Sequence, residues 1–149
     1  YTTVSAIPGV LRIAASVFLG SNMATVQLLE EGPRNYIIKV TGTGGDAAVN
    51  IVDVSTLAPP CEEVRLMSCT YDVAGDGGLV TVLWDATAAV TAMTTSTGSG
   101  QTMCFKKIGG LVNNAGAGKT GDVLLTSTAA TDFTLVLHFK KVGLTTRWN

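Results

Sequence analysis

The glycine-rich stretch at residues 113–120 is the part of this chain that looks most like a chemical motif. It ends in Gly118-Lys119-Thr120, as a phosphate-binding P-loop does. A P-loop needs another glycine five residues before the second one, and Asn113 stands there. It also needs a helix directly afterwards, whose N-terminal amides hold the phosphate. A strand-like run follows instead, so we interpret the stretch as a loop between strands and expect no cofactor.

The sequence gives little indication of residues for acid–base or nucleophilic catalysis. His138 is the only histidine, and no Gly-x-Ser-x-Gly elbow accompanies it. The carboxylate pairs Glu30-Glu31 and Glu62-Glu63 are adjacent in sequence, so on a strand the members of each pair point to opposite faces and cannot flank a glycosidic bond. Asp72 and Asp76 bracket a glycine-rich turn without EF-hand spacing. We predict no catalytic residue and a protein that is not an enzyme.

Three cysteines and one histidine are the candidate soft-metal ligands. Cys61, Cys69 and Cys104 lack the close pairing of zinc sites, and an odd number of cysteines is not a disulfide framework. We therefore expect no metal site. The three thiols are expected to be free and buried, in a protein made in a reducing compartment.

Composition favours a β protein without a polyanionic partner. Charged residues make up 14% of the chain, against roughly 25% in an average soluble domain, while Thr (21), Val (17) and Gly (17) are abundant. Thr and Val are branched at Cβ and suit a pleated sheet. With a net charge of −1, the chain lacks the excess positive charge that is typical of nucleic-acid-binding proteins. The pairs Lys106-Lys107 and Lys140-Lys141 are interpreted as solvated strand ends.

The longest apolar stretch, residues 10–19, contains Arg12 and is about half the ~20 residues needed to cross a bilayer. No basic segment precedes it, so we expect neither a membrane partner nor a signal peptide.

The clearest strand spans residues 132–141. Phe133, Leu135, Leu137 and Phe139 alternate there with more polar residues, and this period of two predicts a central strand with those four side chains in the core. Residues 122–128 are predicted to form a hairpin with it.

A second hairpin is predicted from residues 63–73 and 79–85, because Gly75-Asp76-Gly77-Gly78 between them suits a tight turn. Val80, Val82 and Trp84 share one face, and Trp84 is interpreted as a core residue. Further strands are expected in four ranges, at 36–41, 48–54, 90–95 and 103–108.

About eight short strands with almost no helical periodicity predict an all-β fold. We expect a two-sheet antiparallel sandwich, jelly-roll-like, because each sheet must bury its apolar face against another layer; a closed barrel is the alternative. Strand order is not readable from this pattern.

Two parts are distinguished, residues 1–32 and a β-sandwich domain at 33–149. Residues 10–19 and 24–31 are apolar but fit neither period cleanly. They are compatible with two more strands, a short helix, or an arm on a neighbouring subunit. We expect the arm to make the contact in an oligomer or lattice, because it would otherwise expose apolar surface. Its candidate interaction residues are Val10, Leu11, Ile13, Val17 and Phe18.

Two segments carry a resemblance to a known group of proteins. Residues 80–87 read VTVLWDAT, and about 20 residues later FKKIGG precedes residues 112–123, VNNAGAGKTGDV. They resemble small virion-associated proteins of tailed bacteriophages, especially marine podoviruses, in a strand ending Leu-Trp-Asp-Ala-Thr and in a Gly-Gly-x-x-Asn-Asn-Ala-Gly-x-Gly-x-Thr-Gly-Asp loop. The similarity spans residues 63–141, about half of the chain.

The resemblance implies a location more than a mechanism. We expect a structural virion protein, a capsid decoration (cement) protein on the phage head surface, made in the host cytoplasm. Its partners would be the major capsid protein or other virion subunits, and copies of itself. Asn113 and Asn114 are candidate interaction residues that either cap turns or bond a neighbour. The alternative is a glycan- or host-surface-binding module of a phage fibre or spike, which exposed Trp or Tyr side chains would favour.

Overall fold

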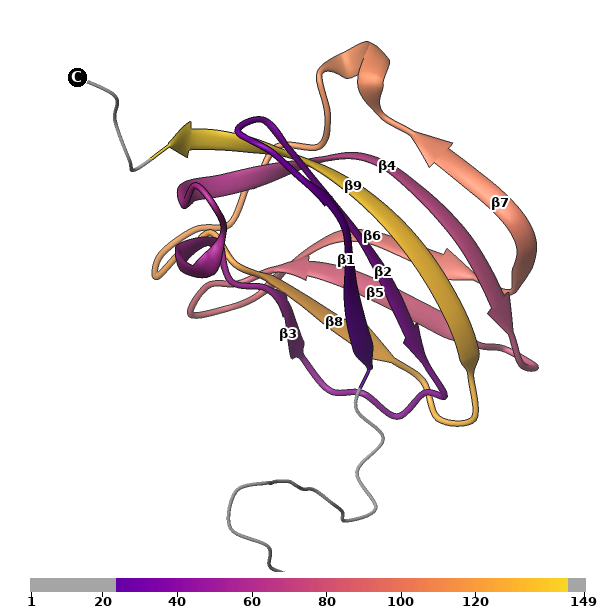
Figure 1. Ribbon diagram of the computed structural model, residues 1–149. Coiled ribbons are helices and arrows are strands. Elements are labelled where there is room, and N and C mark those ends of the chain that lie inside the picture. Colours follow the sequence, from indigo (N-terminus) through magenta and orange to yellow (C-terminus); the bar gives the residue numbers. More distant parts are fainter. Residues whose placement is uncertain (1–23, 145–149) are drawn as a thin grey trace, which may run out of the picture.

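The computed structural model describes residues 24–144, which form nine strands and two short 3₁₀ turns (Figure 1). The strands are β1 (Thr25–Glu31), β2 (Asn35–Gly42), β3 (Val49–Val52), β4 (Cys61–Ala74), β5 (Leu79–Trp84), β6 (Val90–Ser96), β7 (Gly98–Cys104), β8 (Val123–Ser127) and β9 (Asp132–Leu144). The 3₁₀ turns are η1 (Val54–Thr56) and η2 (Lys106–Ile108).

The strands make two antiparallel sheets that pack face to face. The five-stranded sheet has the order β1-β2-β9-β4-β7, and the four-stranded sheet has the order β3-β8-β5-β6. Without β1 the two sheets are β2-β9-β4-β7 and β3-β8-β5-β6, which is the strand order of a jelly roll. The predicted all-β sandwich is therefore confirmed, with nine strands in the place of about eight.

The core lies between the two sheets, and alternation along each strand builds it. Phe133, Leu135, Leu137 and Phe139 of β9 are between 0 and 4% exposed, as predicted. Strand β9 is the middle strand of its sheet and pairs with β2 and β4 over most of its length. From the opposite sheet, Val80, Val82 and Trp84 of β5 are also buried. Trp84 is thus a core residue, as its face predicted.

Both predicted hairpins are wrong. Strands β4 and β5 belong to different sheets, and so do β8 and β9. The glycine-rich turn at residues 75–78 does reverse the chain, with positive φ at Gly75 and Gly77. However, β9 and β7 occupy both edges of β4, so β5 has no free edge to pair with and crosses to the other sheet. The same holds for β9, whose edges are taken by β2 and β4.

Two further boundaries differ from those predicted. Strand β7 spans Gly98–Cys104, so only the first two residues of the predicted strand at 103–108 are in a strand, and residues 106–108 form η2. At the other end, residues 25–31 form β1 at the edge of the five-stranded sheet, which is the extra-strand alternative considered for part of residues 1–32. Residues 10–19, with the candidates Val10, Leu11, Ile13, Val17 and Phe18, lie outside the described residues.

Candidate interaction surfaces

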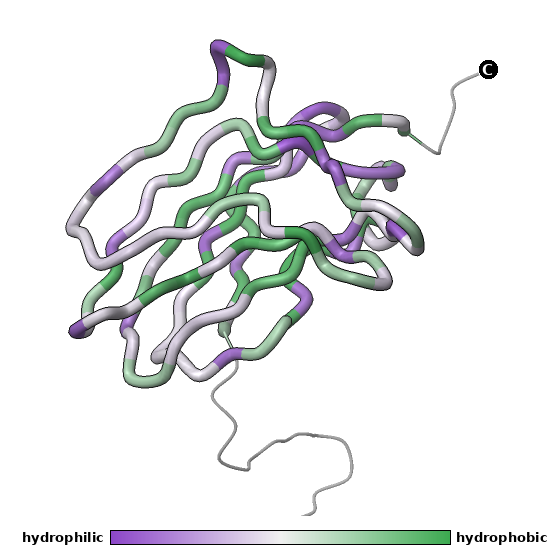
Figure 2. Tube along the Cα trace, turned by 180° about the vertical axis from the view of Figure 1, so that it is seen from behind, coloured by the Kyte–Doolittle hydropathy of each residue, from purple (hydrophilic) through white to green (hydrophobic). Residues whose placement is uncertain are grey.

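Charge is segregated between the two sheets. None of the residues of β3, β5, β6 and β8 is charged, whereas β1, β2, β4 and β9 of the other sheet all carry charged residues. Figure 2 views the molecule from behind and lets the hydropathy be followed along these strands. The sandwich therefore has two different outer faces.

The outer face of the four-stranded sheet is made of uncharged side chains. One row across it pairs Asn50 with Leu124, Leu83 and Thr91 on successive strands, and a second pairs Thr126 with Thr81 and Thr94. The hydroxyl oxygens of Thr81 and Thr94 lie 3.4 Å apart. Leu79, at the start of β5, is 42% exposed. We call this set the uncharged face: Asn50, Leu79, Thr81, Leu83, Thr91, Thr94, Ser96, Leu124 and Thr126.

The outer face of the five-stranded sheet also carries paired threonines, but it is charged. Its middle row runs Gln27, Lys39, Val136, Thr70 and Thr102, and the hydroxyl oxygens of Thr70 and Thr102 lie 3.1 Å apart. Other side chains on this face carry both signs of charge. They are Glu30, Glu63, Arg65, Asp72 and Lys140. We call this the charged face.

His138 lies on the charged face. Its Nε2 is 2.9 Å from the side-chain oxygen of Asn35, and its cross-strand neighbours are Ile37 and Ser68. Burial, and then the nearby Lys106 ammonium, lower the pKa of His138 from its ordinary value. The residue thus makes a cross-strand contact on the outer face of the sheet.

The loop between β7 and β8 crosses from the five-stranded sheet to the four-stranded one. Leu111 exchanges both backbone hydrogen bonds with Leu66 of β4. Further along, Ala117 accepts a hydrogen bond from the Thr87 amide, and a Cβ at Gly118 would collide with the Thr87 side chain. The loop is therefore packed onto the ends of both sheets at its base, while η2 projects from the body of the molecule (Figure 1).

The two asparagines proposed for interaction occupy different environments. The Asn113 side chain accepts a hydrogen bond from the Ala115 amide at 3.0 Å, and the residue is 3% exposed. Asn114 is exposed on the loop surface. Of the two roles considered, Asn113 takes the turn-capping one, and Asn114 alone faces outward. Two exposed apolar residues flank this loop, Ile108 at 69% and Val112 at 51%.

The Gly-Lys-Thr sequence is held by carboxylates. The Lys119 ammonium lies 2.6 Å from a carboxylate oxygen of Glu63 and also donates to the Asn113 carbonyl. The Thr120 hydroxyl donates to Asp85 at 2.8 Å. Strand β8 follows at Val123, as the sequence predicted, where a P-loop would have a helix.

We therefore predict no nucleotide binding at this loop. A phosphate placed there would meet the carboxylates of Glu63 and Asp85, which repel it and already occupy the lysine and threonine. Isothermal titration calorimetry with ATP–Mg²⁺ and GTP–Mg²⁺ should give no heat of binding in the micromolar range. Micromolar affinity that disappears in Lys119→Ala would contradict the prediction.

The three cysteines are free, and two of them are buried as expected. Cys61 is 2% exposed and Cys69 is 0% exposed. Burial raises the pKa of Cys69 to about 12. The expectation for Cys104 is wrong, because it is exposed. Cys104 ends the edge strand β7, where five of seven residues are exposed, and its register partner Ser68 places it on the charged face.

This arrangement predicts one reactive thiol per folded chain. A chromogenic disulfide reagent should label Cys104 quickly, because its thiol is exposed to the reagent. Cys61 and Cys69 should react only after denaturation, which would raise the total to three. Cys104→Ser should abolish the fast phase; a second fast thiol in that variant would show that the core is open to solvent.

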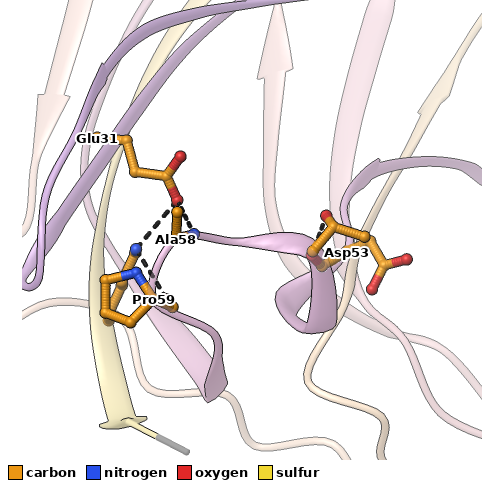
Figure 3. Close-up of polar contacts among 6 residues, drawn as sticks. Glu31, Asp53, Ala58 and Pro59 are labelled. Atoms are coloured by element: carbon orange, nitrogen blue, oxygen red, sulfur yellow. Dashed lines mark hydrogen bonds and ion pairs between the residues drawn. The ribbon is translucent and has the colours of Figure 1, made fainter. Parts of the chain in front are cut away.

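A buried ion pair ties three separate segments together and was not predicted. The Lys141 side chain is 0% exposed, and its ammonium lies 3.0 Å from a carboxylate oxygen of Glu31 in β1 and 2.9 Å from the Pro59 carbonyl. The same Glu31 oxygen accepts from the Ala58 amide at 2.6 Å, as Figure 3 shows. The interpretation of Lys141 as a solvated strand end is therefore wrong, whereas Lys140 is exposed.

The segment after η1 and the side chain of Tyr36 surround this ion pair. Asp53 caps η1 by accepting from the Ser55 amide, and the chain then continues past Leu57 to the Glu31 contact. Burial, and then the Glu31 carboxylate, raise the pKa of Tyr36, which pairs with Glu31 across β1 and β2. Neither charge can be fully hydrated in these surroundings, so each needs the other as its partner.

A second buried carboxylate anchors the start of β1. Asp46 is 4% exposed; one of its oxygens accepts from the Ala24 amide at 2.9 Å and the other from the Ser127 hydroxyl at 2.7 Å. Its backbone also bonds to Ser127 of β8. Neither Asp46 nor Lys141 has a local motif, and their partners are 22 to 110 residues away, so no sequence signal was available for them.

Among residues 24–144, no three His, Cys, Asp or Glu side chains are grouped so that they could hold a metal ion. In the same part of the chain, no helix is long and apolar enough to cross a membrane.

Comparison with known protein families finds no matching family, and comparison with curated proteins finds no matching sequence. The structure presents one uncharged sheet face, one charged sheet face, and an edge strand, β1, with exposed apolar side chains.

Proposed function

We propose that this protein is a structural virion component, a capsid decoration protein that docks on the shell of a tailed phage through its uncharged face. The observation that carries the proposal is the segregation of charge. One sheet face combines Thr, Ser, Asn and Leu without a charged residue, while the other face bears charges of both signs.

A face without charge suits a protein–protein contact. The centre of a protein interface is depleted of charged residues, because burying a charge without a partner carries a large desolvation penalty. Leu79, Leu83 and Leu124 supply apolar contact area between the threonines. The charged face is suited to remain in water on the outside of the particle, since its ions stay hydrated there.

Two weaker arguments point the same way. Residues 80–87 and the loop that follows resemble small virion-associated phage proteins, and Leu83 and Thr81 of the uncharged face lie within that segment. Viral capsid domains are also among the proteins built as jelly rolls. The glycan-binding alternative gains nothing from Trp84, whose side chain is in the core.

The test is an add-back experiment with the full-length protein and particles of the encoding phage that lack it. Binding is measured by co-sedimentation and quantified by mass spectrometry. The wild-type protein should saturate at a copy number set by the repeating shell subunits. Thr81→Lys should weaken binding by roughly tenfold or more, because it buries a charge at the interface.

Thr70→Lys is the matched control. Thr70 also faces outward from the middle of a sheet and lies beside a second threonine, but on the charged face. It should change particle binding by less than about twofold. The proposal is overturned if wild-type protein does not bind particles, or if the two substitutions weaken binding equally.

A further inference from the structure

The side of the sandwich between β1 and β3 is open. Val26 and Leu28 of β1 are register partners of Val40 and Ile38 of β2, and paired residues of antiparallel strands point to the same face. Val40 and Ile38 are 0% exposed, whereas Val26 is 36% and Leu28 is 55% exposed. The two β1 side chains therefore point toward the interior, but no strand of residues 24–144 covers them.

The opening exists because the five-stranded sheet has one strand more, β1, on this side than the four-stranded sheet. The five-stranded sheet extends to β1, while the four-stranded sheet ends at β3, and no strand within residues 24–144 pairs with the outer edge of either. At each end of β1, a hydrogen bond to a neighbouring segment closes the opening. Glu31 fastens one end of β1 to Ala58, and Ala24 at the other end bonds to Asp46, three residues before β3. The apolar middle of β1 is left uncovered.

The chain that precedes β1 arrives at this opening. Ala24 donates to Asp46, and Asp46 is bonded to Ser127 of β8, so the start of β1 is tied to the four-stranded sheet. Residues 10–19 come just before, and five residues, 20–24, separate them from β1. Elsewhere in this fold four residues, 75–78 or 128–131, suffice for the chain to cross between the sheets.

If residues 10–19 are extended, their odd positions form a wholly apolar side, whereas the even positions mix Val10 and Phe18 with Arg12 and Ser16. Leu11, Ile13, Val17 and Leu19 stand at alternate positions around a central Ala15, and the only charged residue, Arg12, is on the other parity. Side chains two apart share a face of a strand. Ten residues also exceed the length of β1, so the segment is long enough to cover Val26 and Leu28.

We infer that residues 10–19 of the same chain occupy this opening, as a fifth strand on the free edge of β3, with Leu11, Ile13 and Val17 against Val26 and Leu28. This completes a sandwich of five strands over five and removes the exposed edge of the four-stranded sheet. The short connection favours the protein's own segment over that of a second copy, because a tether of this length holds it at a high effective concentration. The inference does not depend on the proposed function.

Cysteine cross-linking of the full-length protein tests it. In a Cys104→Ser background, Leu28→Cys is combined with Ile13→Cys or with Val17→Cys, and the protein is treated with a short bis-maleimide at low concentration. We expect a cross-link within one chain, seen as a monomer on a denaturing gel and mapped by mass spectrometry. The control combines Ile13→Cys with Thr70→Cys on the charged face, where no cross-link is expected.

A second measurement uses Leu28→Cys alone in the same background. Its labelling by a maleimide should be at least about tenfold slower than that of Cys104 in the wild type, and Ile13→Asp with Val17→Asp should restore fast labelling. Cross-linked dimers would overturn the inference in favour of exchange between two copies. Fast labelling of Leu28→Cys, together with no cross-link for either pair, would show that the opening is empty and would also overturn it.

Discussion

Leu137→Ala is expected to lower the free energy of unfolding by about 2–5 kcal/mol, and Leu135→Ala by a similar amount. Both side chains are 0% exposed and project from β9, the middle strand of the five-stranded sheet. Removing three carbons there leaves a cavity that the flanking strands cannot fill, since β2 and β4 hold β9 on both edges. Equilibrium unfolding in urea, monitored by tryptophan fluorescence, measures the change.

Thr134→Ala is the control for these core substitutions. It lies on the same strand but faces outward and is exposed, so its effect should stay within about 0.5 kcal/mol. If both leucine substitutions also cost less than about 0.5 kcal/mol, β9 does not present this face to the core.

Glu31→Ala is expected to lower the free energy of unfolding by about 3–5 kcal/mol, as the loss of one member of a buried ion pair does. The substitution leaves the Lys141 ammonium in the interior with the Pro59 carbonyl as its remaining partner. It also leaves the Ala58 amide without its acceptor. Urea unfolding at neutral pH measures the effect.

The neighbouring glutamate provides a matched control. Glu30 precedes Glu31 on the same strand but is exposed on the charged face, so Glu30→Ala should change stability by less than about 0.5 kcal/mol. The double variant Glu31→Ala with Lys141→Met should be more stable than Glu31→Ala alone, because no unpaired charge remains. Equal effects of the two single glutamate variants would mean that the pair contributes nothing.

The sequence predicted only part of the surfaces described above. Asn113 and Asn114 were predicted either to cap turns or to bond a neighbour; Asn113 caps a turn within the loop, and Asn114 is exposed. The uncharged face was not predicted, because its residues come from four separate segments. The sequence does contain four strand-like stretches without a charged residue. They form a common uncharged face only because the tertiary structure places them in one sheet.

Local properties of the sequence determined which residues form strands and which side of each strand is apolar. Alternation in β9 and β5 predicted the buried faces of Leu135, Leu137, Val82 and Trp84, because successive side chains of any extended strand point to opposite sides. Turn positions were equally local, since the glycines at 75 and 77 adopt positive φ whichever sheet the next strand joins.

The tertiary structure alone decided how the strands pair. A four-residue turn can close a hairpin or carry the chain to the opposite sheet, and the outcome depends on which edges more distant strands already occupy; β7 and β9 exclude β5 from β4 in this way. The burial of Lys141 and Asp46 and the exposure of Cys104 follow from the same long-range choice. A residue's environment is set by neighbours up to 110 positions away, which local spacing does not encode.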